Sequence, residues 1–391
     1  MQVIEIKDNS HRQRFHALPH LLYRRDPLWI PHLEKDVEEV FREDKNPSFQ
    51  HGEAIRWILT DNKGNTIGRV AAFINRKALE SMEYPVGGMG FFECINDRSA
   101  AIALFDSCKK WLEERGISAM DGPINFGERD RFWGLLIDSN EPPTYLESYN
   151  MPYYKQFFED YGFKVYFEQH TYGMQKSTFN IERLGKVAAW VTKKGNYRFE
   201  HFRLKHIEAF TGDFVYIYNH AWSKFENFKP VSDAEILRVF ESLKPIVIEE
   251  FIWFAYVDNE PAGFIVMLPD VNQLFKYVRG KMDLIGKLKF LYYKYRRPMN
   301  KVKGLVFGVL PKYHNHGLDA VLVYHFAKEA YQVPQYQHAE IAWVGDFNPR
   351  MESLMKSISG QVVKTHRTYR KIFDKNIDFK PFKLGKYQGK S

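Results

Sequence analysis

The chain carries one order of predicted elements twice within its 391 residues. Each half begins its sheet with two apolar strands joined by a short polar turn, at 54–60 and 66–74 in the first half and at 251–257 and 262–268 in the second. Turns such as Asp-Asn-Lys-Gly between apolar runs are typical of hairpins. A third strand, an amphipathic helix and a further strand follow in both halves. This duplication predicts an α/β (α+β) protein of two related domains, each a mixed twisted sheet flanked by helices.

The third strand of the second half leads into a glycine loop. Residues 305–309 are largely apolar, Pro311 ends the strand, and a helix begins after Gly317. A strand, a glycine loop and a helix N-terminus direct free backbone N–H groups toward one point, which suits a phosphate group. The same pattern also occurs in strand–turn–helix units that bind nothing. In the first half Asp97 or Ser99 stands before the helix instead, which predicts an ordinary N-cap.

This glycine loop resembles the acyl-CoA-binding motif of the GNAT acyltransferase superfamily, in which a strand is followed by Arg/Gln-x-x-Gly-x-Gly/Ala. Gly317 matches the motif, whereas His314 stands in place of Arg or Gln and Asp319 in place of a small residue. A carboxylate at that position would repel a diphosphate. The second GNAT block, a strand followed by an Asn-opened helix, is similar to 339–344 and Asn348.

The resemblance implies acetyl-CoA or another acyl-CoA as co-substrate, bound in the second half of the chain and not in the first. The residues that it assigns to CoA binding are Val309, Pro311, His314, Asn315, His316, Gly317, Leu318, Asp319 and Asn348.

Nearly the whole chain also resembles a bacterial family of uncharacterised tandem GNAT proteins. The matching stretches are 22–31, 90–94, 122–125 and 340–344 with Asn348-Pro349. The resemblance implies an N-terminal GNAT-like domain without the CoA loop at 1–175. It implies a C-terminal GNAT-like domain at 176–391, with a degenerate CoA loop and a basic insertion at about 270–300.

In GNAT enzymes an amine attacks the thioester carbonyl of acyl-CoA directly, backbone N–H groups stabilise the developing oxyanion, and a base accepts the amine proton. An acid for the leaving thiolate is often a Tyr on the Asn-opened helix. The second half has Leu354 and Met355 in that region, while the first half has Tyr153 and Tyr154. Tyr154 is therefore the candidate acid, although it belongs to the half without the CoA loop.

Glu93 is the candidate base, because it stands within an apolar strand where an unpaired carboxylate would be costly. It is either a base of raised pKa or simply the ion-pair partner of Arg69 or Arg76. Candidate acceptor residues follow another strand end, where ligands collect, although a solvated loop explains the same pattern. These residues are Asn125, Arg129 and Asp130.

The net charge of +8 favours anionic partners, among which CoA, nucleic acid and anionic membranes all qualify. Much of the charge lies in the basic stretch 276–297, where a helix would place Leu284, Leu288, Leu291, Tyr292 and Tyr295 on one face. Such a helix is a lid over the acceptor, a phosphate- or membrane-binding surface, or an insertion packed on the domain with a solvated basic face, which is the expectation here.

Two cysteines, Cys94 and Cys108, exclude a disulfide framework and are expected to be core thiols. No apolar run is long enough to span a membrane and no signal peptide is evident, so a cytoplasmic location is expected. The 14 histidines show no metal-ligand spacing, so no metal is expected.

Three functional hypotheses follow. The first is an N-acyltransferase that moves an acyl group, acetyl being the expectation, from acyl-CoA to a small-molecule or peptide amine. The second is a non-catalytic binding module with the GNAT fold, which the carboxylate of Asp319 and the missing tyrosine favour. The third is a relative of tandem GNAT peptidyltransferases that use aminoacyl-tRNA, which the duplication and the basic charge favour. The sequence specifies neither the acceptor nor the oligomeric state.

Overall fold

The computed structural model describes residues 1–223 and 230–383. The first half of the chain comprises β1 (Gln2–Glu5), α1 (Asn9–Leu22), α2 (Glu34–Val40), β2 (Gly52–Thr60), β3 (Thr66–Asn75), α3 (Arg76–Leu79), β4 (Val86–Cys94), α4 (Arg98–Glu113), β5 (Ala119–Gly122), β6 (Leu135–Ser139), α5 (Tyr154–Asp160) and β7 (Lys164–Gln175). The second half comprises α6 (Ile181–Thr192), β8 (Tyr197–His201), α7 (Ile207–Ala221), α8 (Asp233–Leu243), β9 (Ile252–Val257), β10 (Glu260–Pro269), α9 (Asn272–Val278), α10 (Leu284–Arg296), β11 (Lys301–Val309), α11 (Leu318–Gln332), β12 (His338–Gly345), α12 (Pro349–Ser357) and β13 (Gln361–Ile372).

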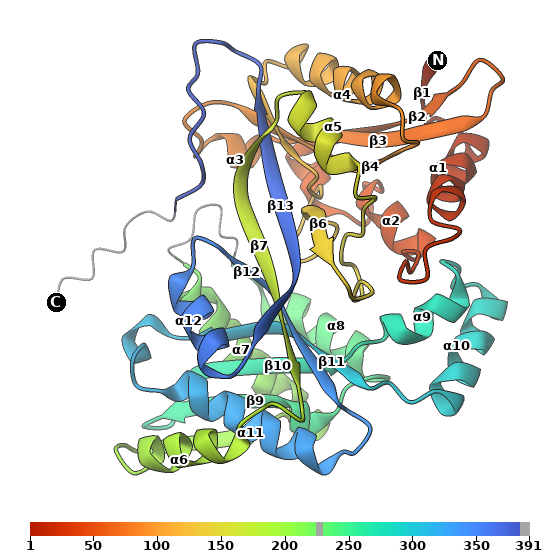
Figure 1. Ribbon diagram of the computed structural model, residues 1–391. Coiled ribbons are helices and arrows are strands. Elements are labelled where there is room, and N and C mark those ends of the chain that lie inside the picture. The colour runs from red at the N-terminus through yellow and green to blue at the C-terminus, as the bar shows by residue number, and fades with distance from the viewer. Residues whose placement is uncertain (224–229, 384–391) are drawn as a thin grey trace.

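The two halves exchange their last strands, so that their sheets join into one. The strand order is β1-β2-β3-β4-β5-β13-β7-β12-β11-β10-β9-β8, and β6 pairs with β13 outside this path. β13, from the end of the chain, pairs antiparallel with β5 of the first half. β7, from the first half, pairs antiparallel with β12 of the second. The long strands β7 and β13 therefore run side by side from one half to the other (Figure 1).

The structure confirms the predicted α/β architecture of two related halves. Both predicted hairpins form, β2 with β3 and β9 with β10. In each half the third strand pairs parallel with the strand that follows its helix, β4 with β5 and β11 with β12. The residue at which the two domains divide stays a prediction, because the exchanged strands give each half a strand of the other.

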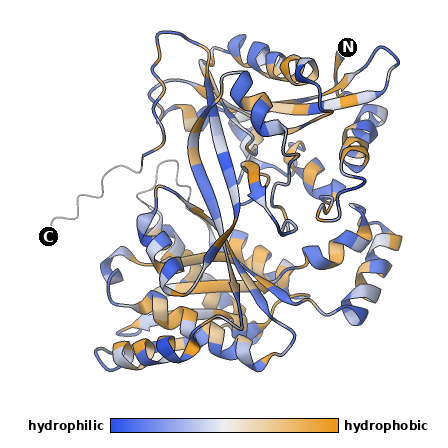
Figure 2. Ribbon diagram, viewed as in Figure 1, coloured by the Kyte–Doolittle hydropathy of each residue, from blue (hydrophilic) through white to orange (hydrophobic). Residues whose placement is uncertain are grey.

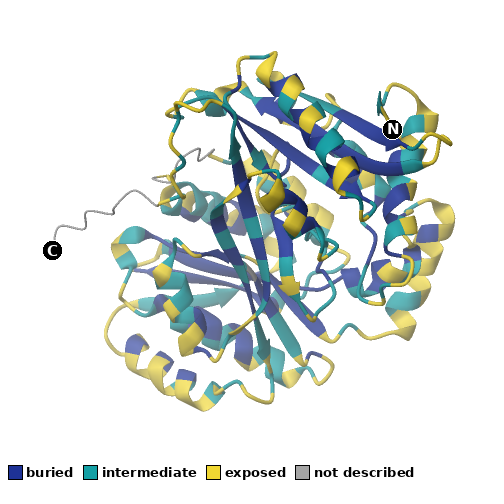
Figure 3. Ribbon diagram, turned by 45° about the horizontal axis from the view of Figure 1, so that its top comes forward, coloured by how far each residue is buried: buried dark blue, intermediate teal, exposed yellow. Residues whose placement is uncertain are grey.

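Apolar side chains from alternating strand positions build separate cores on the faces of the sheet. In the first half, α4 buries Leu104, Phe105 and Cys108 against β3 and β4. In the second half, α11 covers one face with Leu318 and Leu322, and α7 and α8 cover the other. Strands of the second half are largely apolar, whereas the long strand β13 carries many hydrophilic residues (Figure 2). The strands are largely buried (Figure 3). Both cysteines are buried thiols, as predicted.

Candidate active site

The parallel strands β11 and β12 separate part-way along their length. Their register runs from Lys301 opposite His338 to Gly304 opposite Ile341 and ends there. β11 nevertheless continues to Val309, and β12 continues to Gly345. Register shifts in both strands accompany the separation, since β11 shifts against β10 between Gly304 and Val306, and β12 shifts against β7 after Ile341. Such bulges twist a strand away from its neighbour.

The glycine loop that follows β11 leads into a helix whose N-cap residue, Gly317, has no side chain to cap it. Gly317 is the N-cap of α11 in the left-handed conformation (φ 77°), and Asn315 in the same loop has φ 69°. The first N–H groups of a helix have no partner within it, and Gly317 makes no side-chain cap hydrogen bond. A Cβ at Gly317 would stand 2.8 Å from Val191 of α6. The loop therefore needs glycine both for its conformation and for its fit against α6.

The carboxylate of Asp319, which was expected to repel a diphosphate, is already paired. Arg350 of α12 lies 3.4 Å from it, and the other oxygen of Asp319 accepts the Ala320 N–H at 2.9 Å. The ring of His314 bonds the carbonyl of Val309 at 3.0 Å. Burial, and then the charge of Arg350, lower the pKa of His314. Arg350, which sequence reasoning missed, thus brings a cation to the start of α11.

The remaining residues of the predicted CoA set surround this loop. Pro311 begins a short 3-10 helix after β11, and His316 bonds the hydroxyl of Tyr197 at 3.3 Å. Leu318 is fully buried in the core. Asn348 caps α12 by accepting the Met351 N–H at 3.3 Å, as its position before a helix predicted.

In the first half, the chain itself occupies the space where the corresponding strands separate. The register of β4 with β5 ends at Gly88 opposite Asp121. The next residues of the chain then return to β4, where the Ile124 N–H donates to the Met89 carbonyl at 2.8 Å. A Cβ at Gly90 would stand 2.0 Å from the carbonyl oxygen of Ile124. No comparable backbone crossing meets β11 among the residues that the structure describes.

The predicted catalytic residues Glu93 and Tyr154 meet in the core of this first half. The hydroxyl of Tyr154 donates to Glu93 at 2.8 Å, and that of Tyr23 donates to the same oxygen at 2.7 Å. Arg69 lies 3.7 Å from the other oxygen of Glu93, which agrees with the ion-pair alternative, whereas Arg76 pairs with Glu53. Burial raises the pKa of Glu93. Their catalytic role stays a prediction.

The predicted acceptor residues lie in a loop of the first half that reaches the second half. Asn125 is buried and its amide donates to the Glu128 carbonyl at 3.2 Å. The backbone carbonyl of Arg129 accepts from the indole of Trp343 in β12 at 3.3 Å. Burial, and then the charges of Glu128 and Asp130, raise the pKa of Tyr218 in α7. This loop therefore places two exposed carboxylates beside α7 and the end of β12.

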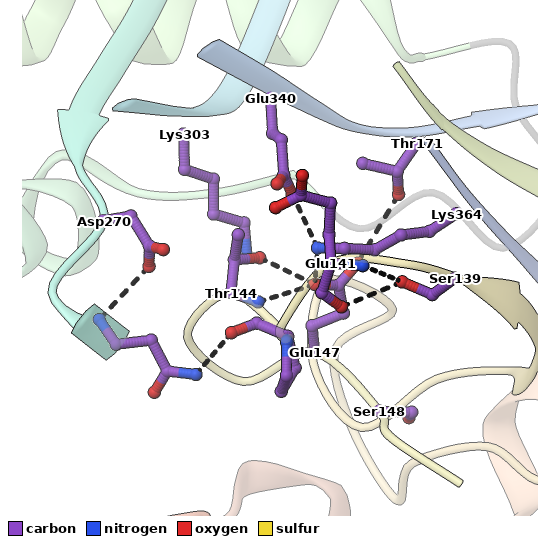
Figure 4. A network of polar contacts seen from close by, with 12 residues as sticks. Ser139, Glu141, Thr144, Glu147, Ser148, Thr171, Asp270, Lys303, Glu340 and Lys364 are labelled. Atoms are coloured by element: carbon purple, nitrogen blue, oxygen red, sulfur yellow. Dashed lines mark hydrogen bonds and ion pairs between the residues drawn. The ribbon is translucent and has the colours of Figure 1, made fainter. Parts of the chain in front are cut away.

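A buried charge network joins the two halves next to the point where β11 and β12 separate (Figure 4). Lys364 of β13 donates to Glu147 at 2.7 Å and to Glu340 of β12 at 2.6 Å. Lys301 of β11 also donates to Glu340. Burial opposes ionisation of Glu147, but Lys364 and neighbouring cations lower its pKa to about 2. Glu340 is one residue from the separation, yet two ammonium groups occupy its carboxylate, so it is not a free base.

Comparisons with known proteins identify the fold. No family model matches the sequence. A solved tandem GNAT protein from the clavulanic acid biosynthesis pathway superposes with a TM-score of 0.55, at 9% identity, over 95% of this chain and 98% of that one. A GCN5-related N-acetyltransferase from Sphaerobacter thermophilus does so with a TM-score of 0.51, at 10% identity, over 97% and 98%. The chain has the tandem GNAT fold.

Two curated relatives align with nearly the whole tandem GNAT chain. The bacterial ceramide synthase of Caulobacter vibrioides is 25% identical over 375 residues, which are 95% of this chain and 97% of that protein. Protein YghO of Escherichia coli K12 is 26% identical over 365 residues, 91% and 92% of the two chains.

A tyrosine that the sequence analysis missed lies where the GNAT strands separate. Tyr172 of β7 stands opposite Ile341, which in turn stands opposite Gly304, in the last paired row of β11 and β12. It belongs to the core between the sheet and α11 and α12, together with Met355. Burial, and then the charge of Glu352, raise its pKa. Because β7 comes from the other half, nothing in the local sequence marks it.

The described residues hold no group of three or more His, Cys, Asp or Glu that would suit a metal ion. Within the same residues, no helix combines the length and the apolar character needed to cross a membrane.

Proposed function

We propose that this protein is an N-acyltransferase that binds acyl-CoA in its C-terminal GNAT copy and transfers the acyl group to an amine. The observation that carries the proposal is the separation of β11 and β12 beside the glycine-opened N-terminus of α11. GNAT enzymes place the pantetheine arm between two such strands. The N-terminal copy is a poor alternative, because the segment around Ile124 already occupies the edge of β4.

The diphosphate of CoA is proposed to bind at the first N–H groups of α11. Gly317 has no side chain to cap those groups, of which the Ala320 N–H is bonded by Asp319. Arg350 adds a cation at the same place. A helix N-terminus and a guanidinium are both favourable to phosphate. The pantetheine arm then follows Val309 and Pro311 toward the row of Gly304, Ile341 and Tyr172, where the thioester lies.

The reaction is proposed to be direct attack of the amine nitrogen on the thioester carbonyl. The amine attacks in its neutral form, the C–N bond forms and the C–S bond breaks. The nitrogen releases its extra proton to solvent, and CoA leaves as a thiolate that takes up a proton. Tyr172 lies in the row where the thioester is placed, so we assign its hydroxyl the role of proton donor to sulfur. Backbone N–H groups of β11 beside its register shift are suited to the oxyanion.

The acceptor is proposed to enter from the side of α7, where the loop of Arg129 meets Trp343. Glu128 and Asp130 are exposed there and attract a protonated amine. The relative named ceramide synthase supports an amine acceptor, since a ceramide is an N-acylated long-chain base. An apolar cavity of about 60 Å³ adjoins the thioester row through Met267 and Ile341 and offers space to an acyl chain longer than acetyl.

Release of free CoA thiol tests the proposal. Purified protein is assayed with acyl-CoAs from acetyl to palmitoyl against short and long-chain primary amines, and amide formation is verified by mass spectrometry. Glu128→Gln with Asp130→Asn is expected to raise KM for a cationic amine several-fold and to leave the Kd for acyl-CoA unchanged. Glu43→Gln, at another exposed carboxylate, is the control. Absence of binding to every acyl-CoA by calorimetry would refute the proposal.

A second candidate, a non-catalytic GNAT-fold module, is favoured by one observation. The carboxylate nearest the strand separation, Glu340, is neutralised by Lys301 and Lys364. The module would be favoured over the enzyme if the protein bound acyl-CoA but formed no amide with any amine, and if Tyr172→Phe left the Kd for acyl-CoA unchanged.

A further inference from the structure

Helix α10 is attached to the protein by one face only. Phe290 contacts Phe275 of α9 with ring centroids 5.5 Å apart, and Tyr293 stacks on Tyr277 of α9 at 3.9 Å. Gly286 lies against the backbone of Lys281, where a Cβ would meet a carbonyl oxygen at 1.9 Å. These contacts set the rotation of α10 about its axis, so the opposite face must point away from the protein.

That opposite face is apolar and exposed. The large apolar side chains of α10 are exposed by 75% at Leu284, 61% at Leu288, 49% at Leu291, 56% at Tyr292 and 83% at Tyr295. At about 100° per residue, they fall within one arc of roughly 120° along the helix. The basic side chains of this insertion are solvated, as expected, but its apolar face is solvated as well and does not pack on the domain. A contiguous apolar face of this kind marks an interaction site.

Basic side chains border this apolar face on both sides. Lys287 and Lys294 lie along one border, and Lys289 and Arg296 lie along the other, by the same helical geometry. The stretch 276–297 contains eight basic residues and one acidic residue, Asp283, so it carries a net charge of +7 of the chain's +8. An apolar stripe between two basic borders is the pattern of helices that lie in the interface of an anionic membrane.

We propose that α10 docks the protein on the surface of a bilayer that contains anionic lipids. The helix lies in the plane of the interface. Leu284, Leu288 and Leu291 enter the boundary between headgroups and acyl chains. Lys287, Lys289 and Arg296 contact lipid phosphates, whereas Lys294 donates to the Pro245 carbonyl at 2.8 Å. A soluble acidic protein or a nucleic acid explains the charge but leaves the apolar arc without a role.

Helix α9, against which α10 packs, contacts the loop of the buried charge network. Asn272 at the start of α9 donates to the Pro143 carbonyl at 2.6 Å, in the same loop as Tyr145 and Glu147 of the buried charge network. Phe275 of α9 contacts Tyr145 with ring centroids 5.2 Å apart. Docking through α10 therefore holds the junction of the two halves close to the lipid surface. The membrane proposal itself stands without the acyltransferase proposal.

Co-sedimentation with vesicles tests the docking. The full chain is expected to bind phosphatidylglycerol–phosphatidylcholine vesicles and to bind phosphatidylcholine vesicles weakly. Leu288→Ser with Leu291→Ser is expected to lower the partition coefficient at least about tenfold. Lys287→Gln with Lys289→Gln is expected to lower it several-fold, and this effect should vanish at about 0.5 M salt. Because all four side chains are exposed, thermal unfolding of these variants should match that of the wild type.

The control replaces apolar residues that are exposed elsewhere. Val187 of α6 is 37% exposed and Val239 of α8 is 49% exposed. Val187→Ser with Val239→Ser should leave vesicle binding unchanged. Unaltered binding of the Leu288/Leu291 variant would overturn the proposal, as would a wild-type protein that ignores both kinds of vesicle. The wild-type protein could instead form a dimer in sedimentation equilibrium and bind no vesicles. If the Leu288/Leu291 variant were then a monomer, the apolar face would be assigned to a second copy of the chain.

Discussion

Replacing Asp319 by Asn tests the proposed diphosphate site directly. Asn keeps the size of the side chain and its bond from the Ala320 N–H, while it removes the negative charge and releases Arg350. If the N-terminus of α11 holds the diphosphate of CoA, both changes strengthen binding. Asp319→Asn is therefore expected to lower the Kd for acetyl-CoA.

The magnitude follows from the charge that is removed. A carboxylate about 7 Å from a diphosphate, at an effective dielectric constant of about 40, raises the free energy of the bound state by about 1 kcal/mol per unit of phosphate charge. That is about fivefold in Kd. The gain should shrink as salt rises. Arg350 is 39% exposed, so its ion pair with Asp319 stabilises the fold by less than about 1 kcal/mol. Loss of the favourable negative charge at the N-terminus of α11 lowers the free energy of unfolding by about 0.5 kcal/mol more.

Isothermal titration calorimetry at low and high salt measures this change. Asp97→Asn is the control, because Asp97 lies at the N-terminus of the corresponding helix in the first half, where it is the N-cap of α4 and accepts the N–H groups of Ser99 and Ala100. It should leave the Kd unchanged. An unchanged or higher Kd for Asp319→Asn, with the fold intact, would show that this loop does not hold the diphosphate.

Three further predictions concern buried groups. Tyr172→Phe should lower kcat for acyl transfer by about tenfold to a hundredfold, since the proposal makes its hydroxyl the proton donor to sulfur. Lys364→Met should lower the free energy of unfolding in urea by about 3–5 kcal/mol, because Glu147 and Glu340 lose their shared cation. Burial, and then Glu340, raise the pKa of Asp270 from 3.8 to about 6. A carboxyl group whose pKa is raised in the folded state destabilises the protein as the pH rises from its unfolded pKa to its folded pKa. Asp270→Asn should therefore stabilise the protein at pH 7 by on the order of 2 kcal/mol and have little effect near pH 4, as thermal unfolding at the two pH values would show.

Local sequence was sufficient wherever a feature depends on neighbouring residues. The turns at 61–64 and 258–261 form the predicted hairpins, Asp97 caps α4, and Asn348 caps α12. Gly317 adopts the left-handed conformation that a glycine loop implies. Each of these depends on hydrogen bonds or backbone conformation within a few residues, which the residue types determine.

Features that depend on contacts between distant segments were not predictable in this way. The exchange of β7 and β13 between halves leaves no local mark, because any apolar strand pairs equally well with either neighbour. Arg350 meets Asp319 only after β12 brings α12 beside α11. Tyr172 reaches the strand separation from the other half of the chain.

The sequence by itself determined the duplicated order of elements, the glycine loop and the amphipathic pattern of α10, because these follow from periodicity and turn chemistry. Only the tertiary structure decided which of the two strand separations is filled and which way α10 faces. Ile124 meets β4 through a backbone contact, and Phe290 and Tyr293 select the docked face of α10. An amphipathic helix presents its apolar side inward or outward according to what it packs against, and residues far from the helix supply that surface.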